Sequence, residues 1–82
     1  MITEILAMLD AMIQKNAHTI MNCQRKSRDL IRLERRWAIN ENQTLKAKAQ
    51  AKLKINQEQE KILAKLQTFL KECRREIQAI EE

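Results

Sequence analysis

The sequence predicts an all-α protein, an antiparallel two-helix hairpin of the coiled-coil type. Its 82 residues include no glycine and no proline, and only 2% of them are aromatic whereas 33% are charged. This composition suits long solvated helices and lacks the turn residues that strands and loops require. The apolar residues also form an approximate mirror image about residue 41, as two antiparallel helices that share one seam would need. A chain of this length makes at most one domain, so we expect a single helical domain over residues 1–82.

One alternative stays open, a single continuous helix that pairs antiparallel with a second copy. It meets the same mirror symmetry, and a chain without glycine and proline carries no strong stop signal. The middle of the chain favours the hairpin, because Asn40 can cap a helix with Gln43 reaching back to it. Thr44 is an alternative cap. We therefore expect helices over about residues 3–39 and 44–80, joined by a turn at about 40–44.

The first helix can be capped by Thr3, and Glu4 in its first turn suits the positive end of the helix dipole. Its seam follows the alternating spacing of three and four residues that is typical of coiled coils. The predicted seam residues are Ile2, Leu6, Leu9, Ile13, Asn16, Ile20, Cys23, Ser27, Leu30, Glu34 and Trp37. The polar ones either fix the register of the two helices or mark a loose, solvated stretch.

Three apolar residues, Ile5, Met8 and Met12, flank this seam near the start of the chain. They widen the apolar arc beyond what one antiparallel helix covers. The surplus contains adaptable methionines and predicts a second interface. The alternative is that it packs against long side chains of the same hairpin.

The second helix begins with residues 45–55, which alternate apolar and polar as a strand would. Alanine, leucine, lysine and glutamine are strong helix formers, so we predict helix there, with poorer packing. Beyond it the predicted seam consists of Leu63, Leu66, Leu70, Cys73, Ile77 and Ile80, flanked by Ile62 and Phe69. In this register Cys23 and Cys73 lie too far apart for an intrachain disulfide.

The charge is uneven along the chain. Residues 25–54 hold ten Lys or Arg and three acids, whereas the remaining residues hold six and eight. The end of the hairpin near the turn should therefore be basic, and basic surface attracts nucleic acid, anionic membranes or acidic proteins. The candidate anion-binding residues are Arg25, Arg28, Arg32, Arg36, Lys46, Lys48 and Lys52.

Residues that would carry out chemistry are sparse. The single histidine, His18, falls on the outward side of its helix, and no cysteine or histidine spacing suits zinc. A glycine-rich phosphate loop cannot form without glycine. We expect no enzyme activity, no cofactor, no metal and no small-molecule substrate. Neither a signal peptide nor a transmembrane segment is apparent, so we expect a cytoplasmic protein.

These observations favour a non-enzymatic protein–protein interaction module, acting as an adaptor, small chaperone or inhibitor through an apolar helical face. Since two helices share only one seam, we expect the hairpin to form a homodimer or to dock on a protein partner. The predicted interface residues are Ile5, Met8, Leu9, Met12, Leu66, Leu70 and Ile77. The alternative function is binding of nucleic acid or another anionic surface by the basic segment 25–54.

Overall fold

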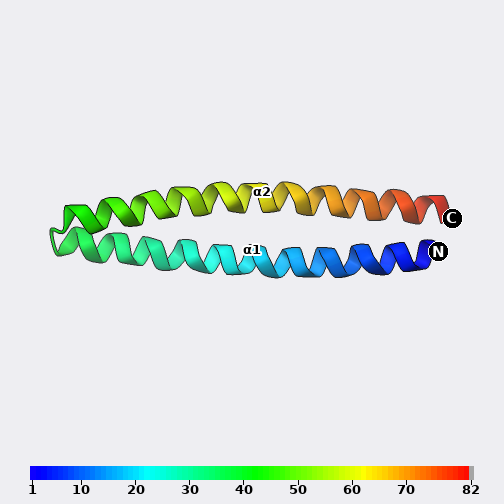
Figure 1. Cartoon of the computed structure of the whole chain (residues 1–82), viewed down its shortest axis with the longest axis horizontal. Helices are drawn as coiled ribbons and strands as arrows, with labels where there is room; N and C mark the ends of the chain where they lie inside the picture. Colours follow the sequence, from blue (N-terminus) through cyan, green and yellow to red (C-terminus); the bar gives the residue numbers. More distant parts are fainter. Residues whose placement is uncertain (82) are drawn as a thin grey trace.

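The computed structural model describes residues 1–81 as an antiparallel helical hairpin (Figure 1). Helix α1 spans Ile2–Ile39 and helix α2 spans Gln43–Glu81, with a three-residue turn between them. Both termini lie at the end opposite the turn, which we call the open end (Figure 1). The hairpin extends 61 × 14 × 13 Å. One continuous helix of this chain would be about 120 Å long at 1.5 Å per residue, so the prediction of a hairpin is confirmed.

The register of the two helices follows the predicted mirror relation. Four side-chain contacts between α1 and α2 join residues whose numbers sum to 83 or 84, close to the expected 82. These contacts are Asp10 with Arg74, Asn16 with Gln67, Ser27 with Asn56, and Glu34 with Gln50. In a fifth contact, between the side chains of Cys23 and Asn56, the sum is 79. The contacts are spread along the whole hairpin, so one register holds from the open end to the turn.

The turn differs in detail from the prediction. Asn42, and not Asn40 or Thr44, caps α2, because its Oδ1 accepts a hydrogen bond from the Leu45 N–H at 3.2 Å. Asn40 instead ends α1, and Glu41 takes the left-handed conformation with φ 57°. The N–H groups of Glu41 and Asn42 donate to carbonyls of the last turn of α1, at 3.2 and 2.9 Å. This is a Schellman motif in which glutamate occupies the position that glycine usually takes.

Helix α1 also begins differently from the prediction. It starts at Ile2 after Met1, whose carbonyl accepts from the Ile5 N–H at 3.2 Å, and no side chain caps it. Thr3 lies inside the helix and is exposed, so it does not serve as the cap. Glu4 does lie in the first turn, where its charge complements the helix dipole.

The seam of α1 contains the residues that the spacing predicts, since all eleven are buried or half-buried. The seam of α2 differs from the prediction at two positions. Gln67 takes the inward position that we expected for Leu66, and Leu66 is exposed. Ile80, also expected in the seam, is exposed as well. The inward residues of α2 include Ala49, Leu53, Asn56, Glu60, Leu63, Gln67, Leu70, Cys73 and Ile77.

The hairpin encloses very little core. Only Cys23, Ala49 and Leu70 are buried hydrophobic residues, and among the described residues no large side chain is fully buried. Most apolar side chains of the seam therefore keep part of their surface in water. A two-helix unit has one contact face per helix, which explains this shortage of buried apolar area.

Candidate interaction surfaces

A buried polar cluster crosses the seam near the middle of the hairpin. Asn56 is only 6% exposed, and its Nδ2 donates to the Cys23 carbonyl and to the Ser27 Oγ, both at 2.7 Å. The Cys23 thiol in turn donates toward the carbonyl and the Oδ1 of Asn56 at 3.3 Å. Every polar group of this cluster is thereby used within the hairpin, so the cluster fixes register rather than presenting a free group.

A second polar contact lies nearer the open end. Asn16 Nδ2 donates to the Leu63 carbonyl at 3.0 Å and to Gln67 Oε1 at 2.9 Å. Gln67 Nε2 completes the contact by donating to the Ile13 carbonyl at 3.1 Å. These bonds give the physical reason for the inward position of Gln67. A buried Asn16 needs a polar partner, and an apolar residue there would leave its amide unpaired.

One ion pair joins the helices near their free ends. Arg74 contacts the Asp10 carboxylate through its Nε, and its guanidinium also donates to Gln78 Oε1 at 2.6 Å. The hydrogen bond and charge of Asp10 raise the pKa of Arg74 above its ordinary value. Both side chains are partly exposed, so this pair orients the helices more than it stabilises them.

Large hydrophobic side chains gather on one side of the open-end half, by which we mean residues 1–20 and 62–81, the turn half being residues 21–61. On α1, Ile5, Met8 and Met12 recur at spacings of three and four residues, and on α2 a second row continues toward the C-terminus. Met12 and Leu66 line the same shallow groove of about 300 Å³ between the helices, so the two rows lie on the same side. We call this surface the apolar face. It consists of Ile5, Met8, Met12, Ile62, Leu66, Phe69 and Ile80, which are between 39% and 75% exposed.

The predicted interface residues divide between the apolar face and the seam. Ile5, Met8, Met12 and Leu66 are exposed on the face. Leu9 and Ile77 are half-buried in the seam. Leu70, at 4% exposure, is covered within the hairpin. The predicted interface residues do not include Ile62 and Phe69, although their spacing of three and four residues about Leu66 marks them as part of the exposed row.

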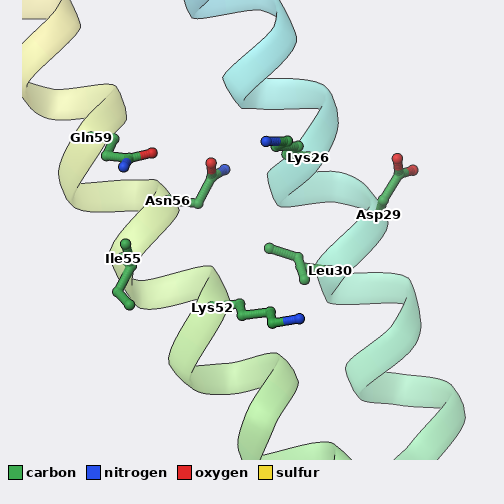
Figure 2. A pocket seen from close by; sticks show the side chains of 7 residues that line it. All are labelled: Lys26, Asp29, Leu30, Lys52, Ile55, Asn56 and Gln59. Atoms are coloured by element: carbon green, nitrogen blue, oxygen red, sulfur yellow. The ribbon is translucent and has the colours of Figure 1, made fainter.

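The groove between the helices continues toward the turn, where its lining changes character. Figure 2 shows Leu30 and Asn56 extending from the two helices into the space between them, with Lys52 reaching from α2 toward α1. This part of the groove has a volume of about 400 Å³ and is also lined by Lys26 and Asp29. In this part of the groove charged side chains thus lie beside the apolar Leu30 and Ile55, of which Ile55 is 61% exposed.

The candidate anion-binding residues do not form one surface. Arg25, Arg28 and Arg32 line a common depression of about 230 Å³ together with Asp29. Lys52 belongs instead to the groove between the helices. The remaining candidates are Arg36 and Lys48, which are exposed, and Lys46, which is half-buried. The structure therefore brings together three of the arginines, and Lys52 lines a neighbouring hollow that shares Asp29 with theirs.

Other chemistry is sparse over residues 1–81. This part of the chain contains no group of three or more histidine, cysteine, aspartate or glutamate side chains that could hold a metal ion. Cys23 and Cys73 are free thiols, and His18 is exposed. Neither described helix has an apolar stretch long enough to cross a membrane.

Comparison with known proteins adds no relative. The chain matches no protein-family model, no curated protein and no solved structure.

Proposed function

We propose that this chain is a non-enzymatic protein–protein interaction module that acts through its apolar face, as an adaptor, small chaperone or inhibitor. The observation that carries the proposal is the apolar face itself. Seven large hydrophobic side chains are exposed on one side of the open-end half, whereas the described residues include three buried hydrophobic ones. Water contact at such a surface is unfavourable, and contiguous exposed apolar patches of this kind mark interaction sites in soluble proteins.

The size of the apolar face supports the same proposal. If a large side chain exposes about 200 Å² when free, the exposed fractions amount to roughly 800 Å² of apolar surface. That is about what one partner contributes to a stable protein–protein interface, and more than a typical monomer leaves in one patch. The methionines add side chains that adapt to the shape of a partner.

The test compares two variants in which methionine becomes lysine. Met12 and Met21 are nine residues, or two and a half turns, apart on α1, so they point in opposite directions. Their exposures are nearly equal, 49% and 50%. We expect the double variant Met8→Lys/Met12→Lys to lose association with any protein partner, including itself, and Met21→Lys to keep it. Cross-linking in cells and of the purified chain provides the measurement, with helicity checked by circular dichroism.

One outcome would contradict the proposal. If the cross-linked species of the unaltered chain persist unchanged in Met8→Lys/Met12→Lys while both variants remain helical, the apolar face is not the interaction surface.

A second candidate function is binding of a polyanion by the turn half. Its support is the depression lined by Arg25, Arg28 and Arg32, whose only acidic lining residue is Asp29. Three guanidinium groups over one depression suit phosphate oxygens. This function predicts affinity for DNA or RNA that falls steeply with added salt and is lost in Arg25→Gln/Arg28→Gln/Arg32→Gln. Binding that is absent at low salt, or insensitive to salt, removes it.

A further inference from the structure

We propose that the occupant of the apolar face is a second copy of this chain, bound antiparallel and overlapping over the open-end halves only. The two hairpins would form a four-helix bundle in the centre of the dimer, and the two turns would project at opposite ends. This inference rests on the proposed function, since it names the partner of the same surface.

The apolar face can meet its own copy without electrostatic repulsion. Two charged residues lie among its apolar side chains, Lys15 beside Met12 and Glu76 between Phe69 and Ile80 along α2. Their charges are opposite, so the face carries no net charge. Both lie at exposed positions, and the long stem of Lys15 can cover apolar surface while its ammonium stays in water. A strongly charged partner would find no complementary net charge on this face. A second copy of the face is also without net charge, so the two copies match.

The same side of the turn half carries lysines beside the exposed Ile55. Lys26 and Lys52 line the groove there with Asp29, and Lys48 follows one turn beyond Lys52 on α2. A parallel dimer with both turns at one end would place these lysines against their own copies. An antiparallel dimer with full overlap would place them against the apolar face. Either arrangement costs desolvation or repulsion of the ammonium groups.

An antiparallel dimer that overlaps over the open-end halves avoids both costs. Each apolar face covers the other, and the lysines of each turn half stay in solvent at the outer ends. Polar Thr19, Asn22 and Gln59 mark the border at which the overlap ends, since they line the groove beyond Leu66. The length of such a dimer is the 61 Å of one hairpin plus about half of that again, or about 90 Å.

The dimer also supplies the core that the single hairpin lacks. In a four-helix bundle each helix packs against two neighbours, so the half-buried seam residues of the open-end half become interior. The two-fold axis falls near the middle of the apolar face, at Met8 and Met12 on α1 and at Phe69 and Cys73 on α2. In a two-fold interface such residues meet their own copies or near neighbours. Roughly 800 Å² from each chain is what a standard interface buries.

Small-angle scattering with absolute molar mass, over a range of concentrations, tests the proposal. We expect a species of twice the chain mass with a maximum dimension near 90 Å. A monomer mass at the highest concentrations overturns it. A dimer of about 60 Å overturns it as well, because that length requires full overlap. A dimer of about 120 Å also overturns it, because two hairpins of 61 Å then do not overlap or the helices are continuous.

Matched variants locate the interface. Met12→Lys should give the monomer mass and a maximum dimension near 61 Å, whereas Met21→Lys should keep the dimer. The hairpin itself should survive in both, because each side chain is about half exposed. A dimer that persists in Met12→Lys, with helicity retained, overturns the assignment of the surface.

Failure of this inference is distinguishable from failure of the proposed function. If the unaltered chain is monomeric but forms a hetero-complex in cells that Met8→Lys/Met12→Lys abolishes, a different protein occupies the face. The interaction function then stands, and self-association is wrong. If neither a homodimer nor a hetero-complex depends on the face, both fail.

Discussion

The open-end half and the turn half of the hairpin share one seam but differ in their outer surfaces. Within the seam each half has a buried apolar residue, Leu70 near the open end and Ala49 near the turn. Each half also has a buried polar contact, of Asn16 with Gln67 and of Asn56 with Cys23 and Ser27. Outside the seam, the open-end half carries the apolar face, whereas residues 25–54 hold ten Lys or Arg and three acids. An apolar outer surface can be extended by a further layer of helices, whereas a charged one stays in water.

The largest effect should come from Leu70→Ala, which removes apolar packing from the open-end half. Leu70 is the most deeply buried leucine of the described residues, so the substitution should lower the free energy of unfolding by about 3 kcal/mol. Urea denaturation followed by circular dichroism measures this, in a Met12→Lys background so that association does not contribute. Leu66→Ala is the matched control, because Leu66 is exposed and should cost less. Equal losses would contradict the division between seam and apolar face.

Asn56→Ala tests the polar contact of the turn half. The substitution leaves the Ser27 hydroxyl and the Cys23 carbonyl buried without their donor, which should cost about 2 kcal/mol. The same denaturation experiment measures it. In Asn56→Leu/Ser27→Ala both side-chain partners become apolar, and we expect most of that stability to return. If Asn56→Ala unfolds at the same urea concentration as the unaltered chain, the hydrogen bonds of Asn56 do not stabilise the turn half.

Asn42→Ala tests how much the turn contributes to stability, separately from the buried contacts of the turn half. It removes the side-chain cap of the Leu45 N–H, and losing such a cap typically costs about 1 kcal/mol. Asn40→Ala serves as control, since Asn40 makes no side-chain cap to α2 and should change the midpoint of unfolding less. A larger loss of stability in Asn40→Ala than in Asn42→Ala would show that Asn40 caps the second helix.

Glu41→Gly should give the smallest effect and the opposite sign. The left-handed conformation costs a residue with a side chain roughly 1–2 kcal/mol, but glycine loses more entropy on folding. The net gain should be about 0.5 kcal/mol in the free energy of unfolding. Glu41→Ala should bring no gain, because alanine pays the same conformational penalty. A stabilised alanine variant would show that the charge of Glu41, and not its backbone conformation, is unfavourable.

The sequence alone was sufficient to predict the hairpin and the seam of α1, because the spacing and the mirror symmetry of the apolar residues are properties of the sequence itself. It was not sufficient for the turn, where several adjacent polar residues could each act as cap. Only the geometry of the connection decides that Glu41 becomes left-handed and that Asn42 caps α2.

The seam of α2 shows a second limit, which also affects the candidate site. Hydrophobic spacing favoured Leu66 as an inward residue. Gln67 is inward instead, because it pairs with Asn16, and this turns Leu66 and Phe69 outward. A partner so far away in sequence cannot be read from local periodicity. The apolar face was therefore predicted on α1 and only in part on α2.

The mirror relation along the seam also bears on domain swapping. Because paired residues are related by reflection about the turn, α1 of one chain could take α2 of another and keep contacts such as Ser27 with Asn56. The swapped and unswapped forms then differ almost only at Asn40, Glu41 and Asn42. A helical Glu41 relieves its left-handed strain but gives up the cap made by Asn42. Those three residues thus determine whether the chain forms the swapped or the unswapped hairpin, because the contacts of the seam are nearly the same in both forms.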